Sequence, residues 1–206
     1  MKIGIIPAVQ IRYKNQIEYV IDTRWFDFLE KKYSKNFKFE ILNYNSQFCH
    51  DLLIITGGND LLSLKNNNAN LMREKLDNRF FSLAKKNNIP IIGICHGAMY
   101  IANKYNAKIN KSKNHLKDHL IIPTSNGKKN NLKIIKTNSY HNFTLSSLSN
   151  KFDILMKSKD NKIESFLSKD KKILGIMWHP ERYKKLKYFD KDLIKKFYAT
   201  NNIICR

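Results

Sequence analysis

Apolar and polar residues alternate along the chain in blocks that predict strands and helices in turn. The first block contains Ile3, Ile5 and Ile6 and predicts a strand at the very start of the chain. The second block has apolar residues at helical spacing and predicts a helix over 17–33. Five further elements follow from the same patterns: a strand at 37–42, a strand at 51–56, a helix at 71–87, a strand at 90–94 and a helix at 96–105.

Strands that alternate with helices favour an α/β fold. We expect a mostly parallel sheet with helices on both faces and ligands at the carboxyl ends of the strands. The stretch 111–168 differs, because Ser, Asn, Gly and Lys turns separate its short apolar runs. These runs predict a small antiparallel edge region with strands at 120–123, 132–136, 152–157 and 163–167. A strand at 173–178 and an amphipathic helix at 186–200 complete the chain, and its 206 residues, 42% of them hydrophobic, predict one domain over 1–206.

The most informative motif is Gly-Ile-Cys-His-Gly at 93–97, directly after a predicted strand. A strand-to-helix corner of this kind holds its central residue in a strained turn with the side chain exposed to a ligand, and small neighbours leave room for the reversal. Cys95 is therefore a candidate nucleophile. A lone cysteine at a strand end is as well explained by structural packing, since free Cys behaves as a small hydrophobe.

The second motif, His-Pro-Glu at 179–181, favours the catalytic interpretation. An apolar strand ends at His179, and the proline after it fixes the backbone so that Glu181 can reach the imidazole. A thiol becomes a strong nucleophile as thiolate, a neighbouring His supplies the base, and a carboxylate orients that base. Alone, His-Pro-Glu would be a surface loop.

A third motif, Gly57-Gly58, follows the predicted strand at 51–56. Glycines let the backbone turn its N–H groups toward a ligand, and acyl transfer needs such donors at the developing oxyanion. The N–H groups of Gly58 and His96 are the expected pair. Without the other two motifs, Gly57-Gly58 would be a plain turn.

Together these motifs resemble those of the class I glutamine amidotransferase-like superfamily, and within it the stand-alone γ-glutamyl hydrolases and peptidases. The resemblance implies that Cys95 is the nucleophile, His179 the base and Glu181 its orienter. It also implies that the segment 138–143 holds the glutamyl head group. The implied substrate-binding residues are Gly57, Tyr140, His141, Asn142 and Phe143.

One residue departs from the pattern of many glutamine-using relatives, which carry Gln where this chain has Met99. A thioether cannot replace the hydrogen bonds of an amide, so Met99 favours a specialised γ-glutamyl substrate. The alternative is that Met99 packs under the helix. We expect hydrolysis through a thioester on Cys95. One alternative is a glutaminase subunit serving a separate synthetase, which the absence of a fused synthetase disfavours. The other alternative is a γ-glutamyl-amine hydrolase.

The chain is strongly basic, with 38 Lys and Arg against 17 Asp and Glu and a formal net charge of +21. Such a field attracts polyanions, so nucleic-acid binding is the rival function. The lysines are scattered, no nucleic-acid motif is present, and a Lys-, Asn- and Ile-rich composition also fits the bias of an AT-rich genome. We therefore favour a small γ-glutamyl substrate linked to a nucleotide, with its phosphates near one of four basic residues: Arg12, Arg24, Arg182 and Lys184.

Two further features of the sequence concern metal binding and the cellular compartment. His115 and His119 are four residues apart and could share a metal on one helical face, but no third ligand of matching spacing is evident, so we expect no metal and no cofactor. The three cysteines, Cys49, Cys95 and Cys205, are an odd number without metal-type spacing. With no stretch of transmembrane length and no signal-peptide pattern, they predict a reduced, cytoplasmic protein without a membrane partner.

Overall fold

The computed structural model describes residues 1–206 except 14–15, 33–36, 113, 185–186 and 202–206. Its helices are α1 (Arg24–Lys32), α2 (Asn68–Lys86), α3 (His96–Lys104), α4 (Ser125–Lys129) and α5 (Tyr188–Thr200), with a 3₁₀ turn, η1, at Pro180–Arg182. Its strands are β1 (Lys2–Ile6), β2 (Ala8–Arg12), β3 (Gln16–Val20), β4 (Lys38–Ile41), β5 (Leu52–Ile55), β6 (Ile91–Ile94), β7 (Lys108–Lys111), β8 (His119–Pro123), β9 (Ile135–Thr137), β10 (Phe143–Ser147), β11 (Phe152–Ser158), β12 (Ile163–Ser168) and β13 (Ile173–Ile176).

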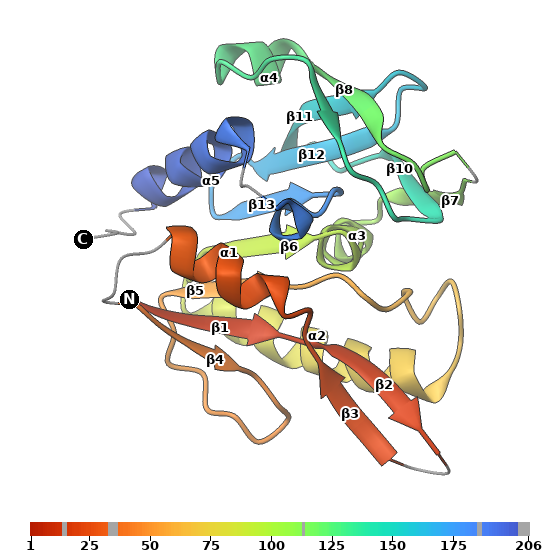
Figure 1. The fold of residues 1–206 in the computed structure, drawn as a ribbon, viewed down its shortest axis with the longest axis vertical. Coiled ribbons are helices and arrows are strands. Elements are labelled where there is room, and N and C mark those ends of the chain that lie inside the picture. The colour runs from red at the N-terminus through yellow and green to blue at the C-terminus, as the bar shows by residue number, and fades with distance from the viewer. Residues whose placement is uncertain (14–15, 33–36, 113, 185–186, 202–206) are drawn as a thin grey trace.

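One large sheet runs through the molecule in the order β4-β1-β5-β6-β13-β12-β11-β8-β9 (Figure 1). The pairs from β4 to β13 are parallel, and those from β13 to β9 are antiparallel. On the antiparallel side, β10 pairs with β12 and with β7. The expected α/β fold with a parallel core is confirmed, and the antiparallel strands extend it from β13 outward.

Helices cover both faces of the parallel half. On one face, α1 and α5 pack through Leu29 and Ile194 onto strand residues such as Ile54 and Ile92. On the other, α2 and α3 pack through Phe80 and Ile101 against the alternate strand residues. Because both faces of β5 and β6 are covered, all their residues are buried, which explains their continuous apolar sequence.

The helix expected at 17–33 is wrong over its first part. Residues Gln16–Val20 form β3, which pairs antiparallel with β2 in a hairpin apart from the large sheet, and the helix begins only at Arg24. The apolar residues at 17, 20 and 21 have helical spacing, but Ile17 pairs across the hairpin with Ile11. Cross-strand pairing overrode the local pattern. Residue 33, the end of that expectation, lies outside the described residues.

In the antiparallel half the strands expected at 120–123, 152–157 and 163–167 correspond to β8, β11 and β12. The strand expected at 132–136 begins three residues later, and β7, β10 and α4 had no counterpart among the expected elements. The closing helix expected at 186–200 begins at Tyr188 where it is described. Among the described residues, no helix combines the length and apolar character needed to cross a bilayer.

Candidate active site

Cys95 lies at the corner between β6 and α3, at the carboxyl edge of the parallel strands. Its backbone is left-handed, with φ of 50° and ψ of −100°, a conformation that costs energy for a non-glycine residue. The corner is held because the Cys95 N–H donates to the Ile176 carbonyl at 2.7 Å. A Cβ on Gly97 would lie 2.1 Å from the Ile55 carbonyl oxygen, so glycine lets α3 press onto β5. The strained turn expected of Gly-x-Cys-x-Gly is present.

His179 follows β13, on the strand beside β6. The side-chain amide of Asn138 holds its backbone on both sides, accepting from the His179 N–H and donating to the His179 carbonyl, each at 2.8 Å. Pro180 starts the η1 turn, which brings Glu181 back to the imidazole, where Nδ1–H donates to Oε1 at 2.6 Å. The proline therefore positions the carboxylate as the sequence suggested.

The second imidazole nitrogen of His179 faces the thiol. A Cβ placed on Gly57 would lie 2.6 Å from His179 Cε1 and 3.4 Å from both His179 Nε2 and Cys95 Cβ, so the glycine leaves the space that the two side chains share. Burial alone would lower the pKa of His179. The negative charge of Cys95, the hydrogen bond to it and the hydrogen bond to Glu181 together raise that pKa to about 9. The geometry therefore brings the imidazole and the thiol together in one buried space.

His96, directly after the cysteine, has a different role. Its Nδ1–H donates to the Asn59 carbonyl at 2.8 Å, and its Nε2–H donates to Asp77 at 2.8 Å. Asp77 is fully buried and also accepts from Arg73 at 2.9 Å. Burial opposes ionisation of Asp77, but Arg73 and His96 hold its pKa below the usual value. Since neither nitrogen of His96 is free, its ring cannot serve as the base, and its backbone N–H remains available.

The expected oxyanion donors are the backbone N–H groups of Gly58 and His96. Gly58 has φ of +124°, and His96 is the first residue of α3, where backbone N–H groups have no partner within the helix. The side chain of Asn59 bonds the backbone of Val9 in both directions, at 2.8 and 2.9 Å, and so fixes the loop after β5. The oxyanion role of Gly58 and His96 remains a prediction.

The segment 138–143 lies beside His179. The ring of Tyr140 packs edge-on against the His179 ring, with 5.6 Å between the ring centroids. The Arg182 guanidinium lies over the Tyr140 ring, with its Cζ 4.7 Å from the ring centroid. The imidazole of His141 is instead buried: Nδ1–H donates to the Phe143 carbonyl at 2.8 Å. Burial, the strongest influence, lowers the pKa of His141 to about 4. Its side chain is committed to the protein interior, while Asn142 is exposed.

Met99 is 3% exposed and belongs to the apolar cluster between α2, α3 and the sheet. It is packed under the helix, the alternative considered above. A substrate contact of Met99 remains a prediction.

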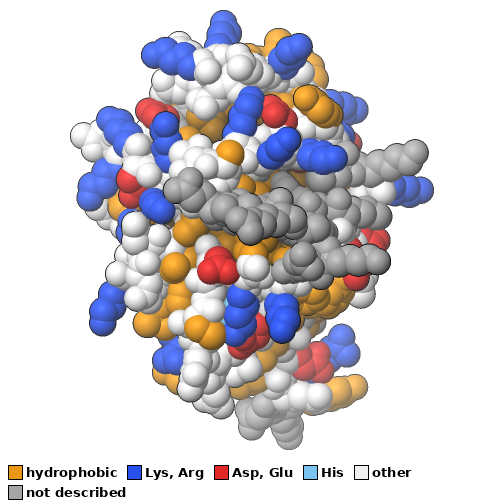
Figure 2. Space-filling model, turned by 90° about the vertical axis from the view of Figure 1, so that its left-hand side faces the viewer, with side chains coloured by type: hydrophobic (Ala, Val, Ile, Leu, Met, Phe, Trp, Pro, Cys, Tyr) orange, Lys and Arg blue, Asp and Glu red, His pale blue; other side chains and the backbone are white. Residues whose placement is uncertain are grey.

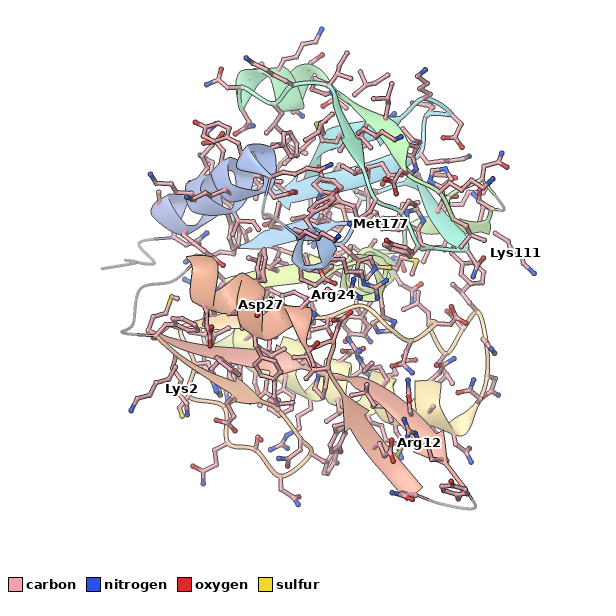
Figure 3. The ribbon with its side chains drawn as sticks, viewed as in Figure 1. Lys2, Arg12, Arg24, Asp27, Lys111 and Met177 are labelled. Carbon is pink, nitrogen blue, oxygen red and sulfur yellow. The ribbon has the colours of Figure 1, made fainter. Side chains whose placement is uncertain are left out.

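Two neighbouring cavities meet at the His-Pro-Glu segment. The first is lined by residues of the site, among them Thr56, Gly57, Gly58, His179 and Glu181. The second contains three of the basic residues expected to bind phosphate, namely Arg24, Arg182 and Lys184. The fourth, Arg12, lies out on the β2–β3 hairpin and is paired with Glu18 at 3.1 Å (Figure 3).

Two polar side chains of the site, Asp77 and Arg73, went unnoticed in the sequence, and Asn138 was included only as part of the segment 138–143, without its contact to His179. Asp77 and Arg73 stand at i and i+4 spacing on α2, the one local signal that could have suggested a pair. Asn138 gives no such signal, because its partner His179 is 41 residues away. Of the three cysteines, Cys49 is exposed and free, Cys95 is buried and free, and Cys205 lies outside the described residues.

Comparison with known proteins agrees with the geometry. Residues 32–200 match the family Glutamine amidotransferase class-I, and the chain belongs to this family. A γ-glutamyl-CDP-amidate hydrolase of Campylobacter jejuni is 33% identical over 163 residues, covering 77% of this chain and 78% of that protein. A glutamine amidotransferase-like protein of Lactococcus lactis is 24% identical over 172 residues, covering 71% and 72%.

Solved structures show the same fold. A GMP synthase-type protein of Thermoplasma acidophilum superposes with a TM-score of 0.72 at 18% identity, over 98% of this chain and 94% of that one. A glutamine amidotransferase of Thermotoga maritima superposes with a TM-score of 0.68 at 16% identity, over 100% and 86%. At these identities the likeness concerns the fold.

Proposed function

We propose that this protein hydrolyses a γ-glutamyl amide through a thioester on Cys95, with residues 1–206 acting as one catalytic domain. The observation that carries the proposal is a cysteine at a strained corner that contacts an imidazole whose other nitrogen is bonded to a buried carboxylate. A thiolate, a proton donor and an orienting carboxylate are the parts that acyl transfer needs.

The proposed reaction has two halves. The Cys95 sulfur bonds to the γ-carbonyl carbon, and the N–H groups of Gly58 and His96 donate to the resulting oxyanion. The carbon–nitrogen bond then breaks, and the proton on His179 Nε2 passes to the departing nitrogen. Water next gives a proton to His179 and attacks the thioester; its oxygen stays on glutamate, and the sulfur leaves to restore Cys95.

For the leaving group we propose cytidine diphosphate amidate, which gives glutamate and CDP-amidate as products in a step of capsule biosynthesis. The name of the Campylobacter relative supports this choice, as do the basic residues of the second cavity. Arg24 already donates to both oxygens of Asp22, at 2.8 and 2.5 Å. Among the described residues, the Nε of Arg182 makes no hydrogen bond, and it lies 3.7 Å from Asp22 and 3.8 Å from Glu181. Because Arg182 also lines the second cavity, it is the first candidate for a phosphate oxygen.

The test measures glutamate release by the purified protein from γ-glutamyl-CDP-amidate, L-glutamine and a γ-glutamyl amine. We expect the nucleotide substrate to have the highest kcat/KM, and the Cys95→Ala protein to be folded and inactive. Quenching during turnover should trap a glutamyl adduct on Cys95, visible as a mass increase and removed by hydroxylamine. Wild-type-like hydrolysis by the Cys95→Ala protein would refute the proposed site.

The leaving group is tested separately. CDP should inhibit competitively at low salt, and the inhibition should weaken as salt rises. Replacing Arg182 by Gln should raise KM for the nucleotide substrate by the equivalent of about 1.5–3 kcal/mol, the usual contribution of a charge-assisted hydrogen bond. Arg12→Gln is the matched control, because Arg12 lies on the hairpin. If nucleotides do not bind and a γ-glutamyl amine is turned over well, the hydrolase remains and the CDP-amidate assignment is wrong.

Two other functions have distinct outcomes. An ammonia-supplying glutaminase would act on L-glutamine only after its synthetase is added. A nucleic-acid-binding protein would give a gel shift that survives physiological salt. Figure 2 does not favour the second, because on the face it shows the Lys and Arg side chains are scattered among neutral and apolar groups and do not form one patch.

A further inference from the structure

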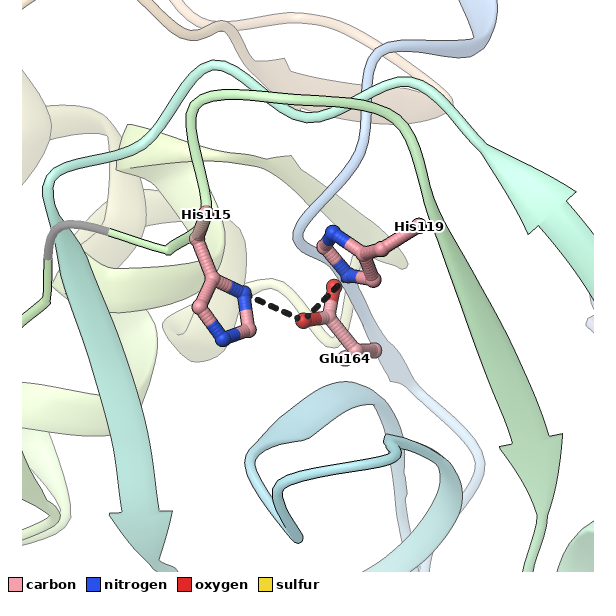
Figure 4. A group of neighbouring side chains, drawn as sticks. All are labelled: His115, His119 and Glu164. Carbon is pink, nitrogen blue, oxygen red and sulfur yellow. Dashed lines mark hydrogen bonds and ion pairs between the residues drawn. The ribbon is translucent and has the colours of Figure 1, made fainter.

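Three imidazoles converge on one buried carboxylate in the antiparallel half of the molecule. His115 lies in the loop before β8, His119 is the first residue of β8, His141 precedes β10, and Glu164 belongs to β12. The His115 and His119 rings point at the carboxylate from two sides (Figure 4). His115 Nδ1 lies 3.2 Å and His119 Nε2 3.1 Å from Glu164 Oε1, and His141 Nε2 lies 3.8 Å from Oε2.

Each imidazole donates its outward nitrogen to a fixed acceptor. His115 Nε2–H donates to Asp160 at 3.1 Å, His119 Nδ1–H to the Lys117 carbonyl at 3.2 Å, and His141 Nδ1–H to the Phe143 carbonyl at 2.8 Å. In a neutral imidazole, such a bond leaves the inward nitrogen with its lone pair. Metal-binding histidines are oriented by the same kind of outer partner, a carboxylate or a carbonyl.

The inward atoms are buried, and several have no hydrogen-bond partner. His115, His141 and Glu164 are 2%, 3% and 1% exposed. Within the described part of the chain, three atoms of the cluster make no hydrogen bond: His115 Nδ1, His141 Nε2 and Glu164 Oε2. Lone pairs that face a carboxylate in a buried site repel it unless a cation lies between them, and an unsatisfied buried polar atom costs free energy. The cluster therefore has a place for a positive ion.

We propose that His115, His119, His141 and Glu164 bind one Zn²⁺ ion. Imidazole nitrogens and a carboxylate oxygen are ligands that Zn²⁺ accepts in tetrahedral geometry. With metal–ligand bonds of about 2.0–2.1 Å, the edges of such a tetrahedron are about 3.3 Å. The distances to Glu164 Oε1, 3.2 Å from His115 and 3.1 Å from His119, already match. His141 Nε2, which lies 3.8 Å from the second oxygen Oε2, is the fourth ligand of the proposed set. The ligand atoms of His115, His119 and Glu164 lie within 4.8 Å of one another, so the widest pair closes somewhat on binding.

The ion would stabilise the loop that carries Tyr140. The Ser139 hydroxyl and the His141 N–H both donate to the His115 carbonyl, the latter at 3.2 Å. Tyr140, which stands between these two residues, packs against His179. One Zn²⁺ would thus join the loop before β8, the loop before β10 and strand β12. The role is structural and does not depend on the proposed hydrolysis.

Metal binding is tested in the Cys95→Ala protein, which lacks the buried thiol beside an imidazole that could bind Zn²⁺ instead. The protein is stripped with chelator, dialysed and titrated with Zn²⁺ by calorimetry. We expect one ion per chain, and Co²⁺ in its place should give visible d–d bands of a tetrahedral centre without a thiolate charge-transfer band. Absence of binding, or a thiolate band, would overturn the proposal.

Variants in the same background locate the ion. Glu164→Gln should weaken Zn²⁺ binding roughly 100-fold or more. Asp160→Asn, which alters the outer partner of His115 and an acceptor of the Ser158 hydroxyl, should weaken it about 10- to 100-fold. Asp192→Asn is the matched control, because Asp192 pairs with Lys196 elsewhere on the surface. His119→Gln keeps the test decisive if Glu164→Gln does not fold, since His119 is the more exposed ligand. Unchanged affinity in His119→Gln would refute the site.

A final measurement uses the wild-type protein. Zn²⁺ bound at the Glu164 cluster should leave the rate of Cys95 alkylation by iodoacetamide unchanged. Removal of the ion should raise the KM for the γ-glutamyl substrate with little change in kcat. Protection of Cys95 by Zn²⁺ would place the ion at the thiol and would contradict the assignment.

Discussion

Two histidine–carboxylate centres belong to the neighbouring strands β13 and β12 and differ in what faces the inward imidazole nitrogen. At the thiol centre, one imidazole lies between Glu181 and Cys95, so each nitrogen has a different partner. At the Glu164 cluster, three imidazoles share one carboxylate, and their outward nitrogens are held by other acceptors. The first arrangement can move a proton. The second can hold a cation.

The comparison shows that an imidazole beside a carboxylate has no fixed role. His96 makes this clear, because it also bonds a buried carboxylate, yet both its nitrogens already have protein partners and neither faces a thiol or a shared ligand. The group at the remaining nitrogen determines the chemistry: a thiol for His179, a shared carboxylate for His141, and a backbone carbonyl for His96.

The sharpest test of the difference exchanges one imidazole at each centre. His179→Gln should lower kcat/KM for γ-glutamyl hydrolysis roughly 10²- to 10⁴-fold, the usual contribution of a general acid–base group. His119→Gln should leave kcat within a few-fold, because its ring is on the Glu164 side. Steady-state kinetics of the two variants measures both effects. Equal losses of kcat would mean that the two centres do not differ in their role in catalysis.

The next largest effect concerns stability at the thiol centre. Asp77→Ala leaves the guanidinium of Arg73 buried without its carboxylate, so the free energy of unfolding should fall by about 3–5 kcal/mol. At the other centre, Asp160→Asn removes a half-exposed partner and should cost below about 1 kcal/mol in the metal-free protein. Urea unfolding of both variants measures the two values. A small loss for Asp77→Ala would mean that water reaches Arg73.

A single methyl group tests the spacing between Cys95 and His179. Gly57→Ala introduces a Cβ that would lie 2.6 Å from His179 Cε1, so the imidazole must move away from the thiol. A misplacement of about 1 Å at reacting groups can cost on the order of 10²-fold in rate. We expect a loss of that size in kcat/KM, with the Zn²⁺ affinity of the Glu164 cluster unchanged. Full activity would show that the contact between the two side chains is not required.

The smallest predicted effect is on pH dependence. Because the pKa of His179 is raised to about 9, kcat/KM should fall above that pH as the imidazole loses the proton needed by the leaving nitrogen. Glu181→Gln removes one of the interactions that raise this pKa, so the basic limb of the profile should move to lower pH. If the basic limb does not move, its pKa belongs to a group other than His179.

The same linkage has a defined sign for stability. The folded-state pKa of His179 lies above its ordinary value of 6.5. The contribution of protonated His179 to the free energy of unfolding is therefore fully present below about pH 6.5 and is lost as pH rises through about 9. Unfolding free energies of wild type and His179→Gln, measured across this range, should converge on the basic side. Parallel curves would show that His179 has no shifted pKa.

Sequence patterns located the parallel half of the molecule well. Strands β1, β5, β6 and β13 are short apolar runs, and the strand-end rule brought Cys95, His179 and Gly58 to one edge. The hairpin of β2 and β3 was missed, because its pairing is with residues across a turn and its spacing imitated a helix. In the antiparallel half, β7 and β10 are polar enough to give no apolar run.

What the sequence by itself determined is the family and the fold class. It also predicted the candidate residues Cys95, His179 and Glu181, because each stands in a short local motif whose geometry is set by neighbouring glycine or proline. The tertiary structure alone decided that Asp77 holds His96, that Asn138 holds His179, and that Glu164 lies among His115, His119 and His141. These partners are 19 to 49 residues apart in the chain. No local pattern encodes such contacts, because they arise only when the sheet brings distant strands and loops together.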